Sequence, residues 1–222
     1  MSEHMALENL TVLDLTRVLA GPFCTMMLAD MGANVIKIEV PKGGDDTRSY
    51  PPFRAKNLNG ERESVYFANI NRNKKGITLN LKAPEGKEIF KELVKKADIV
   101  VENYRPGVMD KLGLGYDVLK EINPRIIYAA VSGFGCYGPY HLRPGYDILA
   151  QAMGGMMSIT GSKGGEPTRA GSALGDILGG LHVTIGILAA VNARTITGKG
   201  QRVDVSLMDS MIAATENTAL KY

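Results

Sequence analysis

The sequence from residue 10 to residue 39, LTVLDLTRVLAGPFCTMMLADMGANVIKIE, decides the fold of this chain. Its first six residues form a continuous β-prone run, which is typical of a strand buried on both faces. A helix is expected from Ala20, with Pro22 in its first turn, and it stops at Gly32. Residues 35–39 are the next strand. The order strand, helix, strand predicts a right-handed βαβ unit in a parallel sheet.

The same alternation of strands and helices continues along the chain. Further strands are expected at residues 77–81, 99–102, 126–131 and 201–206. Helices are expected to begin at Pro84, Tyr146 and Leu207, and a long apolar helix covers residues 181–193. Residues 41–62 are rich in Gly, Pro, Asp and Arg and predict a long loop. The pattern predicts an α/β fold, in which a Rossmann-like parallel sheet is flanked by helices.

The composition is that of a folded protein with a sizeable core: 222 residues, 45% hydrophobic and 22% charged. A net charge of +3 is too small to indicate a nucleic-acid binder. Two cysteines, Cys24 and Cys136, indicate no disulfide framework and fit a reducing compartment. The first residues lack the pattern of a signal peptide, and the longest apolar run, residues 185–191, is too short to span a bilayer. We therefore expect a cytoplasmic protein that binds neither nucleic acid nor membrane.

A lone acid, Asp176, lies in a stretch of residues with small side chains, residues 171–180, before the long apolar helix. At the start of a helix, a carboxylate meets unpaired N–H groups and the positive end of the macrodipole, which favours its ionised form. The flanking glycines would let a ligand approach closely. An ionised, accessible carboxylate can act as a nucleophile or a base. Asp is also a frequent helix cap, so the spacing alone leaves both roles open.

Two basic features lie where the chain turns. Residues 71–75, Asn-Arg-Asn-Lys-Lys, form either a solvated turn or a phosphate contact. Arg105 follows the expected strand at 99–102, and ligands of open α/β sheets bind at the carboxyl ends of strands. Arg105 is therefore either placed to meet an anionic ligand or a surface arginine beside a turn.

Several familiar sites are missing from the sequence. His4, His141 and His182 are scattered and no Cys/His pair has ligand spacing, so no metal site is expected. The chain has no GxxxxGK[ST] phosphate loop and no GxSxG elbow. Residues 133–138 spell GFGCYG, a literal GxGxxG, but Pro139 follows and no amphipathic helix opens there. The remaining groups, one carboxylate and several basic residues, suit covalent chemistry on an acyl group that is carried by a phosphorylated handle.

Four stretches carry a resemblance: residues 12–39, residues 71–75 (NRNKK), residues 101–107 (VENYRPG), and residues 171–176 (GSALGD) with the later Gly198-Lys199-Gly200-Gln201 and Asp204. Together they resemble the class III CoA-transferase family, which includes formyl-CoA and carnitine CoA-transferases. The likeness covers nearly the whole chain in the family's order. The fold that it implies is the Rossmann-like, N-terminal part of an interlocked-dimer CoA-transferase.

The resemblance also implies a mechanism. In this family an aspartate attacks the thioester carbonyl of an acyl-CoA, and CoA is then held on the enzyme as an aspartyl thioester until an acceptor acid takes it. Asp176 matches that nucleophile, and Tyr146 and Asp147 match residues of the active site. Coenzyme A would be a substrate, not a permanently bound cofactor. The residues implied to hold it are Arg17, Val18, Leu19, Ala20, Arg72, Asn73, Lys74, Lys75, Asn103 and Arg105.

Some residues depart from the family's pattern. The formate-specific branch has a glutamine where Leu19 stands, so formyl transfer is not expected. Related α-methylacyl-CoA racemases use a histidine that falls at Tyr146, and a tyrosine, with an unperturbed pKa of about 10, is a poor base at neutral pH. The alternatives to CoA transfer are racemisation of an α-methylacyl-CoA and a non-catalytic CoA-binding subunit of a heteromeric transferase.

The chain stops at Lys221-Tyr222, inside an expected helix. Members of the family have a second, smaller domain after this point, return to the first domain with a C-terminal segment, and pair as two interlocked rings. We therefore expect residues 1–222 to form the large Rossmann-like domain without the small domain and the return segment. We also expect the full-length protein to be a homodimer, and this piece to be weak or inactive by itself.

Overall fold

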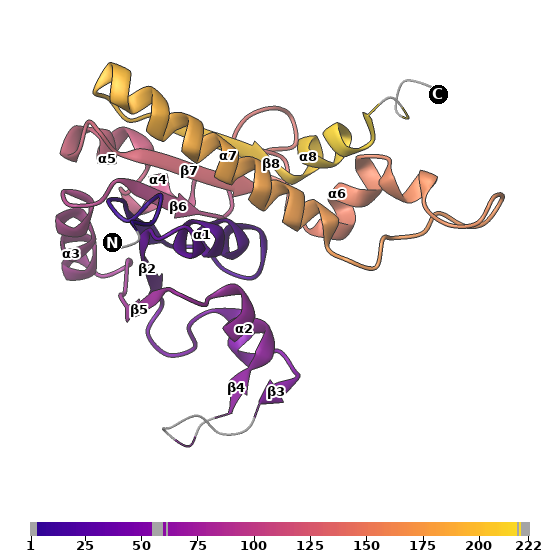
Figure 1. Ribbon diagram of the computed structural model, residues 1–222, viewed down its shortest axis with the longest axis horizontal. Coiled ribbons are helices and arrows are strands. Elements are labelled where there is room, and N and C mark those ends of the chain that lie inside the picture. The colour runs from indigo at the N-terminus through magenta and orange to yellow at the C-terminus, as the bar shows by residue number, and fades with distance from the viewer. Residues whose placement is uncertain (1–3, 55–59, 61, 217, 219–222) are drawn as a thin grey trace.

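A six-stranded sheet lies at the centre of the computed structural model, which describes residues 4–54, 60, 62–216 and 218. Its strand order is β5–β2–β1–β6–β7–β8, and neighbouring strands are parallel throughout. The strands are β1 Thr11–Asp14, β2 Asn34–Glu39, β5 Lys75–Thr78, β6 Ile99–Glu102, β7 Ile127–Ser132 and β8 Arg202–Ser206. With helices on both faces, this is the α/β fold that the sequence predicts (Figure 1).

The first βαβ unit has nearly the bounds expected from the sequence. β1 leads into α1 (Ala20–Asp30), and β2 begins at Asn34. Between them, Gly32 has a φ of +102°, a conformation that favours glycine and turns the chain after the helix. β1 pairs with β2 on one side and with β6 on the other, so the order of the strands reverses at β1. Open α/β sheets bind ligands beyond the carboxyl ends of the strands at such a point.

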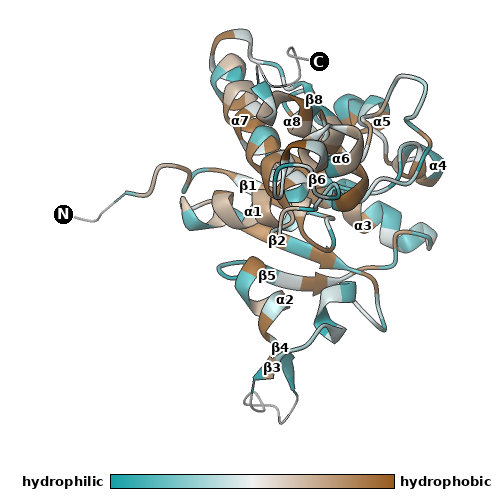
Figure 2. Ribbon diagram, turned by 90° about the vertical axis from the view of Figure 1, so that its right-hand side faces the viewer, coloured by the Kyte–Doolittle hydropathy of each residue, from teal (hydrophilic) through white to brown (hydrophobic). Residues whose placement is uncertain are grey.

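The strands contribute side chains to two hydrophobic cores, one on each face of the sheet. Val12 in β1 belongs to the core under α1 and α7 (Leu174–Thr197). Leu13, the next residue, belongs to the core under α3 (Pro84–Val94), α4 (Val108–Leu112) and α5 (Tyr116–Ile122). α6 (Asp147–Met153) and α8 (Leu207–Ala214) pack against α7, and Figure 2 shows the two helical layers on either side of the strands. Burial on both faces explains why the strands are continuous apolar runs.

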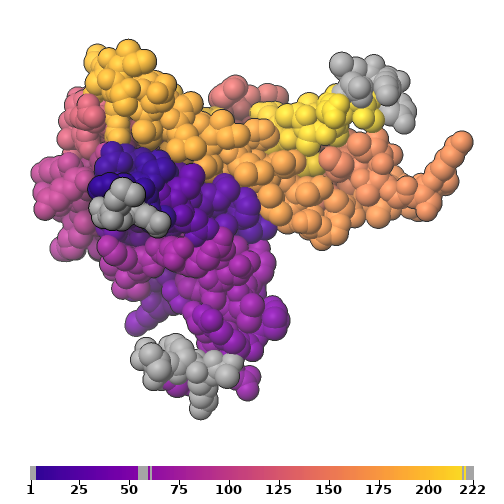
Figure 3. Space-filling view, viewed as in Figure 1, coloured from indigo at the N-terminus to yellow at the C-terminus, as the bar shows by residue number. Residues whose placement is uncertain are grey.

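A smaller part of the chain lies beyond the edge strand β5 (Figure 1). It holds η1 (Asp46–Ser49), α2 (Val65–Ile70) and the short antiparallel strands β3 (Phe53–Arg54) and β4 (Glu63–Ser64). The loop expected at 41–62 therefore contains short elements, while residues 55–59 and 61 lie outside the described part. η2 (Met156–Ile159) packs beside α6, and the segment that follows it extends away from the body of the molecule (Figure 3).

Two elements begin earlier than the sequence predicts. β5 starts at Lys75 because its pairing with β2 starts there, opposite Ile36, whereas the apolar residues of the segment start only at Ile77. α7 starts at Leu174, before the apolar run, because its first turn is held by a contact from α6 that is described below. Residues 133–138 contain no helix, as expected, and the next helix is α6.

By length and composition α7 is, among the described residues, the helix that could cross a membrane. Its 18-residue window has a mean hydropathy of 1.8, and 39% of that window is buried inside the protein. α7, with 24 residues, is much longer than the apolar run at 185–191 on which the sequence-based expectation rested. The helix packs on α1, β7 and α8, and Val183 and Ile187 are fully buried. Some of the apolar side chains of α7 are therefore part of the hydrophobic core.

Candidate active site

A cavity of about 180 Å³ opens at the carboxyl ends of the central strands. Much of its wall comes from four segments that are far apart in the sequence: the β1–α1 connection, the loop after β6, the loop before α6 and the first turn of α7. The segments contribute residues 17–20, 103–106, 143–146 and Asp176. Asp46, residues 131–133 at the end of β7 and Leu207 of α8 line the rest. The sheet topology alone places a ligand site here, at the point where the strand order reverses.

Asp176 lies in the first turn of α7 and lines the cavity. The N-cap of this helix is Ala173, which makes no side-chain capping bond. The Asp176 carboxylate has no hydrogen-bond or ion-pair partner among the described residues. The interpretation of Asp176 as a helix cap is therefore wrong, and Asp176 instead contributes to the wall of the cavity.

The pKa of Asp176 is raised to about 7. Burial is the main cause because it disfavours the charged carboxylate, and the negative charge of Asp147 adds to it, while Arg169 opposes it. The sequence led us to expect that the helix dipole would keep Asp176 ionised. Desolvation outweighs the dipole here, so the carboxylate takes up and releases its proton near neutral pH.

Asp147 is the first residue of α6, and its side chain is buried. One oxygen accepts a hydrogen bond from the backbone N–H of Gly175 at 2.8 Å, and the other forms an ion pair with Arg169 at 2.8 Å. Both oxygens also accept from the Gln151 side chain, at 3.1 and 2.9 Å. Asp147 therefore satisfies an N–H group at the start of α7 from a neighbouring helix, as a cap residue would do within its own helix.

The glycines near Asp176 serve the packing of helices. A Cβ at Gly179 would lie 2.4 Å from a methyl carbon of Leu207 in α8. A Cβ at Gly180 would lie 2.8 Å from the carbonyl oxygen of Ala20 in α1. Small residues at these positions let α7 approach both helices, and this fixes the distance between the Asp176 turn and the start of α1. Helix packing therefore explains why Gly179 and Gly180 are glycines, without the close approach of a ligand that the sequence led us to expect.

Three arginines line the cavity: Arg17, Arg105 and Arg143. The Arg17 guanidinium lies 5.6 Å from the ring centroid of Tyr104 and 3.5 Å from a carboxylate oxygen of Asp46. Arg143 lies 4.1 Å from the ring centroid of Tyr140. Planar guanidinium groups suit phosphates and carboxylates, since each donates two hydrogen bonds at once. Arg17 and Arg105 were expected from the sequence, whereas Arg143 was not. The signal that could have pointed to Arg143 is its position just before Pro144-Gly145 and the Tyr146-Asp147 pair.

The basic cluster at 71–75 does not reach this cavity. The Lys74 ammonium forms an ion pair with Asp14 at 3.0 Å, and both side chains are at most 1% exposed. Lys74 also donates to the Asn71 side chain at 2.9 Å. Arg72 and Asn73 both bind Asp30 at the end of α1. These contacts attach the segment before β5 to α1 and β1. The buried Lys74 ammonium therefore already has its partners within the protein.

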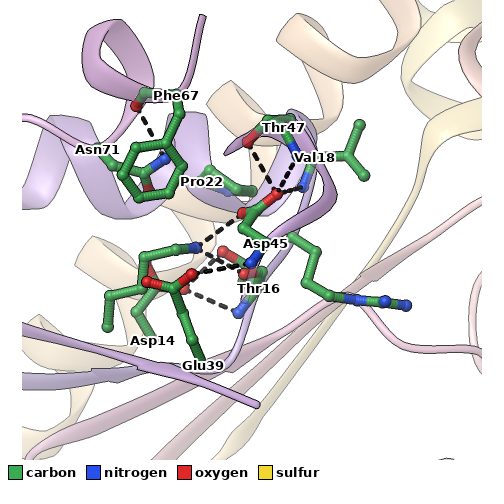
Figure 4. A network of polar contacts seen from close by, with 12 residues as sticks. Asp14, Thr16, Val18, Pro22, Glu39, Asp45, Thr47, Phe67 and Asn71 are labelled. Carbon is green, nitrogen blue, oxygen red and sulfur yellow. Dashed lines mark hydrogen bonds and ion pairs between the residues drawn. The ribbon is translucent and has the colours of Figure 1, made fainter. Parts of the chain in front are cut away.

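The lysine and aspartate of this buried pair affect each other's protonation. Burial alone would raise the pKa of Asp14, but the ammonium groups of Lys74 and Lys37 outweigh it and hold the pKa below its ordinary value. Burial lowers the pKa of Lys74, and Asp14 opposes that effect. The pair is surrounded by hydrogen bonds, including one from the Thr16 N–H to Asp14 at 2.8 Å (Figure 4). A buried ion pair with satisfied neighbours of this kind fixes the geometry around it.

Val18, in the cavity wall, has a φ of +67°. For a β-branched residue this left-handed conformation costs about 1–2 kcal/mol. Its N–H donates to the Asp45 carboxylate at 3.3 Å, and the same oxygen accepts from the Thr47 hydroxyl at 2.8 Å (Figure 4). Asp45 also forms an ion pair with the buried Lys37 at 3.0 Å. Strained backbone that is held in this way is common at ligand sites.

Two tyrosines differ in their relation to the cavity, because Tyr146 lines it and Tyr66 does not. Tyr146, which is 68% exposed, lines the cavity as the N-cap of α6. Tyr66 in α2 was not found from the sequence. Burial raises its pKa to about 12, and the negative charge of Asp176 contributes to this shift. Tyr66 therefore remains a neutral phenol at neutral pH.

Residues 7–222 match the sequence model of CoA-transferase family III, and the chain therefore belongs to this family. The family and the fold class expected from the sequence are both confirmed. Among the described residues, no group of three or more His, Cys, Asp or Glu side chains is arranged to hold a metal ion.

The chain is similar in sequence to proteins that are named as acyl-CoA or CoA-transferases. The chain is 50% identical over 224 residues to an acyl-CoA transferase of Fusarium pseudograminearum, which covers 100% of this chain and 49% of that protein. It is 48% identical over 223 residues to a succinyl-CoA:mesaconate CoA-transferase of Haloarcula marismortui, which covers 98% of this chain and 55% of that protein. A crystal structure of a CAIB/BAIF family protein from Brucella suis matches with a TM-score of 0.94 and 45% identity, over 99% of this chain and 58% of the other. The chain thus spans about half the length of the curated relatives it matches.

Proposed function

We propose that this protein transfers coenzyme A from an acyl-CoA to a carboxylic acid, with Asp176 as the nucleophile. One observation carries the proposal: the Asp176 carboxylate, which has no partner among the described residues, lies in a cavity whose wall also holds three arginines. The position at the carboxyl ends of the central strands suits a large anionic ligand. Membership of CoA-transferase family III supports the class of reaction.

The reaction begins when a carboxylate oxygen of Asp176 attacks the thioester carbonyl carbon. The C–S bond breaks, the CoA thiolate leaves, and an acyl-aspartyl anhydride remains. The thiolate then attacks the aspartyl carbonyl carbon, which releases the donor acid as a carboxylate and leaves an aspartyl-CoA thioester. The acceptor carboxylate attacks this thioester and expels the thiolate. Attack of the thiolate on the acceptor's carbonyl carbon forms the new acyl-CoA and returns Asp176 as a carboxylate.

The surroundings of Asp176 support this chemistry. A carboxyl group with a pKa of about 7 is a stronger base than an ordinary aspartate, yet it is substantially ionised at neutral pH. The wall also includes Leu19 and Ala20, at the N-terminus of α1. The unpaired N–H groups and the positive end of this helix can stabilise negative charge that develops on the thioester oxygen.

The acceptor that we propose is a small dicarboxylic acid. Relatives of this chain are named for transfer of CoA to mesaconate, oxalate and glutarate. A second carboxylate on the acceptor would find a partner in Arg143 or Arg17, which line the same cavity.

The homodimer and the cytoplasmic location remain predictions. We do not favour racemisation, because Tyr146 occupies the position of the racemase base.

The test is a search for the covalent intermediate. We would incubate the protein with acetyl-CoA and with succinyl-CoA and measure its intact mass, then add hydroxylamine and locate the resulting hydroxamate by peptide mapping. We expect a CoA adduct that becomes a hydroxamate at Asp176 and is lost in Asp176→Asn. Asp209, which also lies in the first turn of a helix but outside the cavity, provides the matched control Asp209→Asn. Full transferase activity of Asp176→Asn would overturn the proposed mechanism.

A further inference from the structure

Asn103, which follows β6, uses its side-chain amide to bind the backbone of Arg17, which follows β1. The Oδ1 atom accepts a hydrogen bond from the Arg17 N–H at 2.8 Å, and the Nδ2 atom donates one to the Arg17 carbonyl oxygen at 2.6 Å. The backbone pairing of the two strands ends just before this point, where the Leu15 N–H donates to the Val101 carbonyl oxygen at 2.9 Å. The amide of Asn103 therefore continues the pairing of β1 and β6 beyond their last backbone bond.

The segment that Asn103 holds is a wall of the cavity. Arg17 and the three residues after it line the cavity, and Val18 among them is in a strained conformation. The residues on either side of Arg17 have their own partners: the Thr16 carbonyl oxygen accepts from a buried lysine at 2.8 Å, and the Val18 N–H donates to Asp45 at 3.3 Å. Asn103 supplies the backbone contacts of the residue between them. Without its amide, the Arg17 N–H and carbonyl oxygen would lose the two hydrogen bonds that reach them from the β6 side.

We propose that Asn103 is a positioning residue of the transfer site, which holds Arg17 and Val18 so that the Arg17 side chain and the start of α1 face the substrate. This inference rests on the proposed function. The resemblance to the family implied instead that Asn103 contacts CoA itself. Both the oxygen and the nitrogen of its amide already have backbone partners, which is the arrangement of a brace between two loops. The same brace keeps Arg17 beside Tyr104, the residue that follows Asn103.

Two variants separate a brace from a ligand contact. Asn103→Ala removes both hydrogen bonds, while Asn103→Asp keeps an acceptor for the Arg17 N–H but cannot donate to the carbonyl oxygen. In the ligand-free protein, we expect the Arg17 amide hydrogen to exchange about tenfold faster in Asn103→Ala, with a smaller change in Asn103→Asp. With acyl-CoA, we expect kcat to fall by a larger factor than KM rises in both variants. If Asn103→Ala does not fold, Asn103→Asp alone still tests the proposal, because its side chain cannot donate the hydrogen bond to the Arg17 carbonyl oxygen.

Asn123 provides a matched control at the opposite end of the sheet. Its side chain also braces backbone groups, because it accepts from the Arg125 N–H at 3.0 Å and donates to the Ala97 carbonyl oxygen at 2.9 Å. It does not line the cavity. We expect Asn123→Asp to lower the urea midpoint of unfolding while kcat and KM stay at the wild-type values.

The outcomes are distinguishable. Unchanged exchange at Arg17 together with a loss of CoA affinity would make Asn103 a ligand contact and overturn the proposal. Faster exchange with unchanged kcat and KM would overturn it as well, because the brace would then be purely structural. Exchange is measured without substrate, so a failure to form any adduct at Asp176 would refute the proposed function and leave the exchange result as it stands.

Discussion

The Asp147 carboxylate accepts a hydrogen bond from the backbone N–H of Gly175 at 2.8 Å. This contact joins the first turn of α6 to the first turn of α7, one residue before Asp176. It has two consequences for Asp176. It fixes the backbone on which the carboxylate stands, and it brings a second negative charge close enough to raise the pKa of Asp176.

The pH dependence of the reaction follows from this pair. Asp176 must be ionised to attack, so we expect kcat/KM to fall as the pH drops below about 7. In Asp147→Asn the neighbouring charge is lost while an amide oxygen can still accept from Gly175, so the acid limb should move to lower pH. Measuring kcat/KM against pH for the wild type and for Asp147→Asn, with an acyl-CoA donor that saturates the enzyme, tests this prediction. An acid limb at the same pH in Asp147→Asn would show that Asp147 has no electrostatic role.

The raised pKa of Asp176 also predicts a change in stability. A carboxyl whose pKa is higher in the folded than in the unfolded protein makes the folded state less stable as the pH rises from about 4 to about 7. Asp176→Asn removes this effect. We expect the variant to match the wild type near pH 4 and to exceed its free energy of unfolding by about 1–2 kcal/mol at pH 8, since partial exposure reduces the full effect.

Urea unfolding at the two pH values measures the difference, and Asp209→Asn is again the control. Asp209 is an exposed first-turn acid of α8, so its replacement should change stability by no more than about 0.5 kcal/mol at either pH. A destabilised Asp176→Asn at pH 8 would contradict the burial argument.

The neighbouring lysines 74 and 75 should respond very differently to replacement by methionine. Lys74→Met leaves the Asp14 carboxylate buried without its partner and should cost about 3–5 kcal/mol. Lys75 is exposed, and within the described part of the chain its ammonium donates to the Asn34 side chain alone, at 2.7 Å, so Lys75→Met should cost less than about 0.5 kcal/mol.

Urea unfolding of the two variants and of the double variant Asp14→Asn/Lys74→Met measures the pair. The double variant should be more stable than Lys74→Met alone, because it no longer buries an unpaired charge. Equal losses in Lys74→Met and Lys75→Met would contradict the structure, in which only Lys74 is buried.

Arg105 is exposed at the mouth of the cavity, and no other group in the described residues binds its guanidinium. If it binds a phosphate of CoA, Arg105→Gln should raise KM for acyl-CoA about 10-fold, the loss of one charge-assisted hydrogen bond, with a smaller change in kcat. Arg125→Gln is the control, because Arg125 is an exposed arginine that binds the Gly198 carbonyl oxygen away from the cavity. Initial rates measured against acyl-CoA concentration give KM for each variant. An unchanged KM in Arg105→Gln would show that Arg105 does not bind CoA.

Much of the fold could be predicted because its determinants are local. A strand buried on both faces must be a continuous apolar run, so the pattern around Val12 and Leu13 is readable in the sequence. A helix that follows such a strand and ends at a glycine predicts a parallel pair, and the carboxyl ends of parallel strands predict the edge at which Arg105 lies. Side-chain pairs between distant segments leave no such local pattern. Nothing near Lys74 in the sequence distinguishes it from Lys75, although one is buried against Asp14 and the other faces solvent.

The sequence by itself determined the class of fold, the family and the identity of Asp176 as the acid to examine, because these depend on local apolar periodicity and on residue types at fixed spacing. Only the tertiary structure decided that Asp176 has a raised pKa, that Asp147 holds the turn that carries it, and that Asn103 binds the backbone of Arg17. Each of these depends on burial or on charges and hydrogen bonds between segments that meet only when the sheet is assembled. Desolvation and Coulomb energy are set by distances in space, which residue spacing along the chain does not encode.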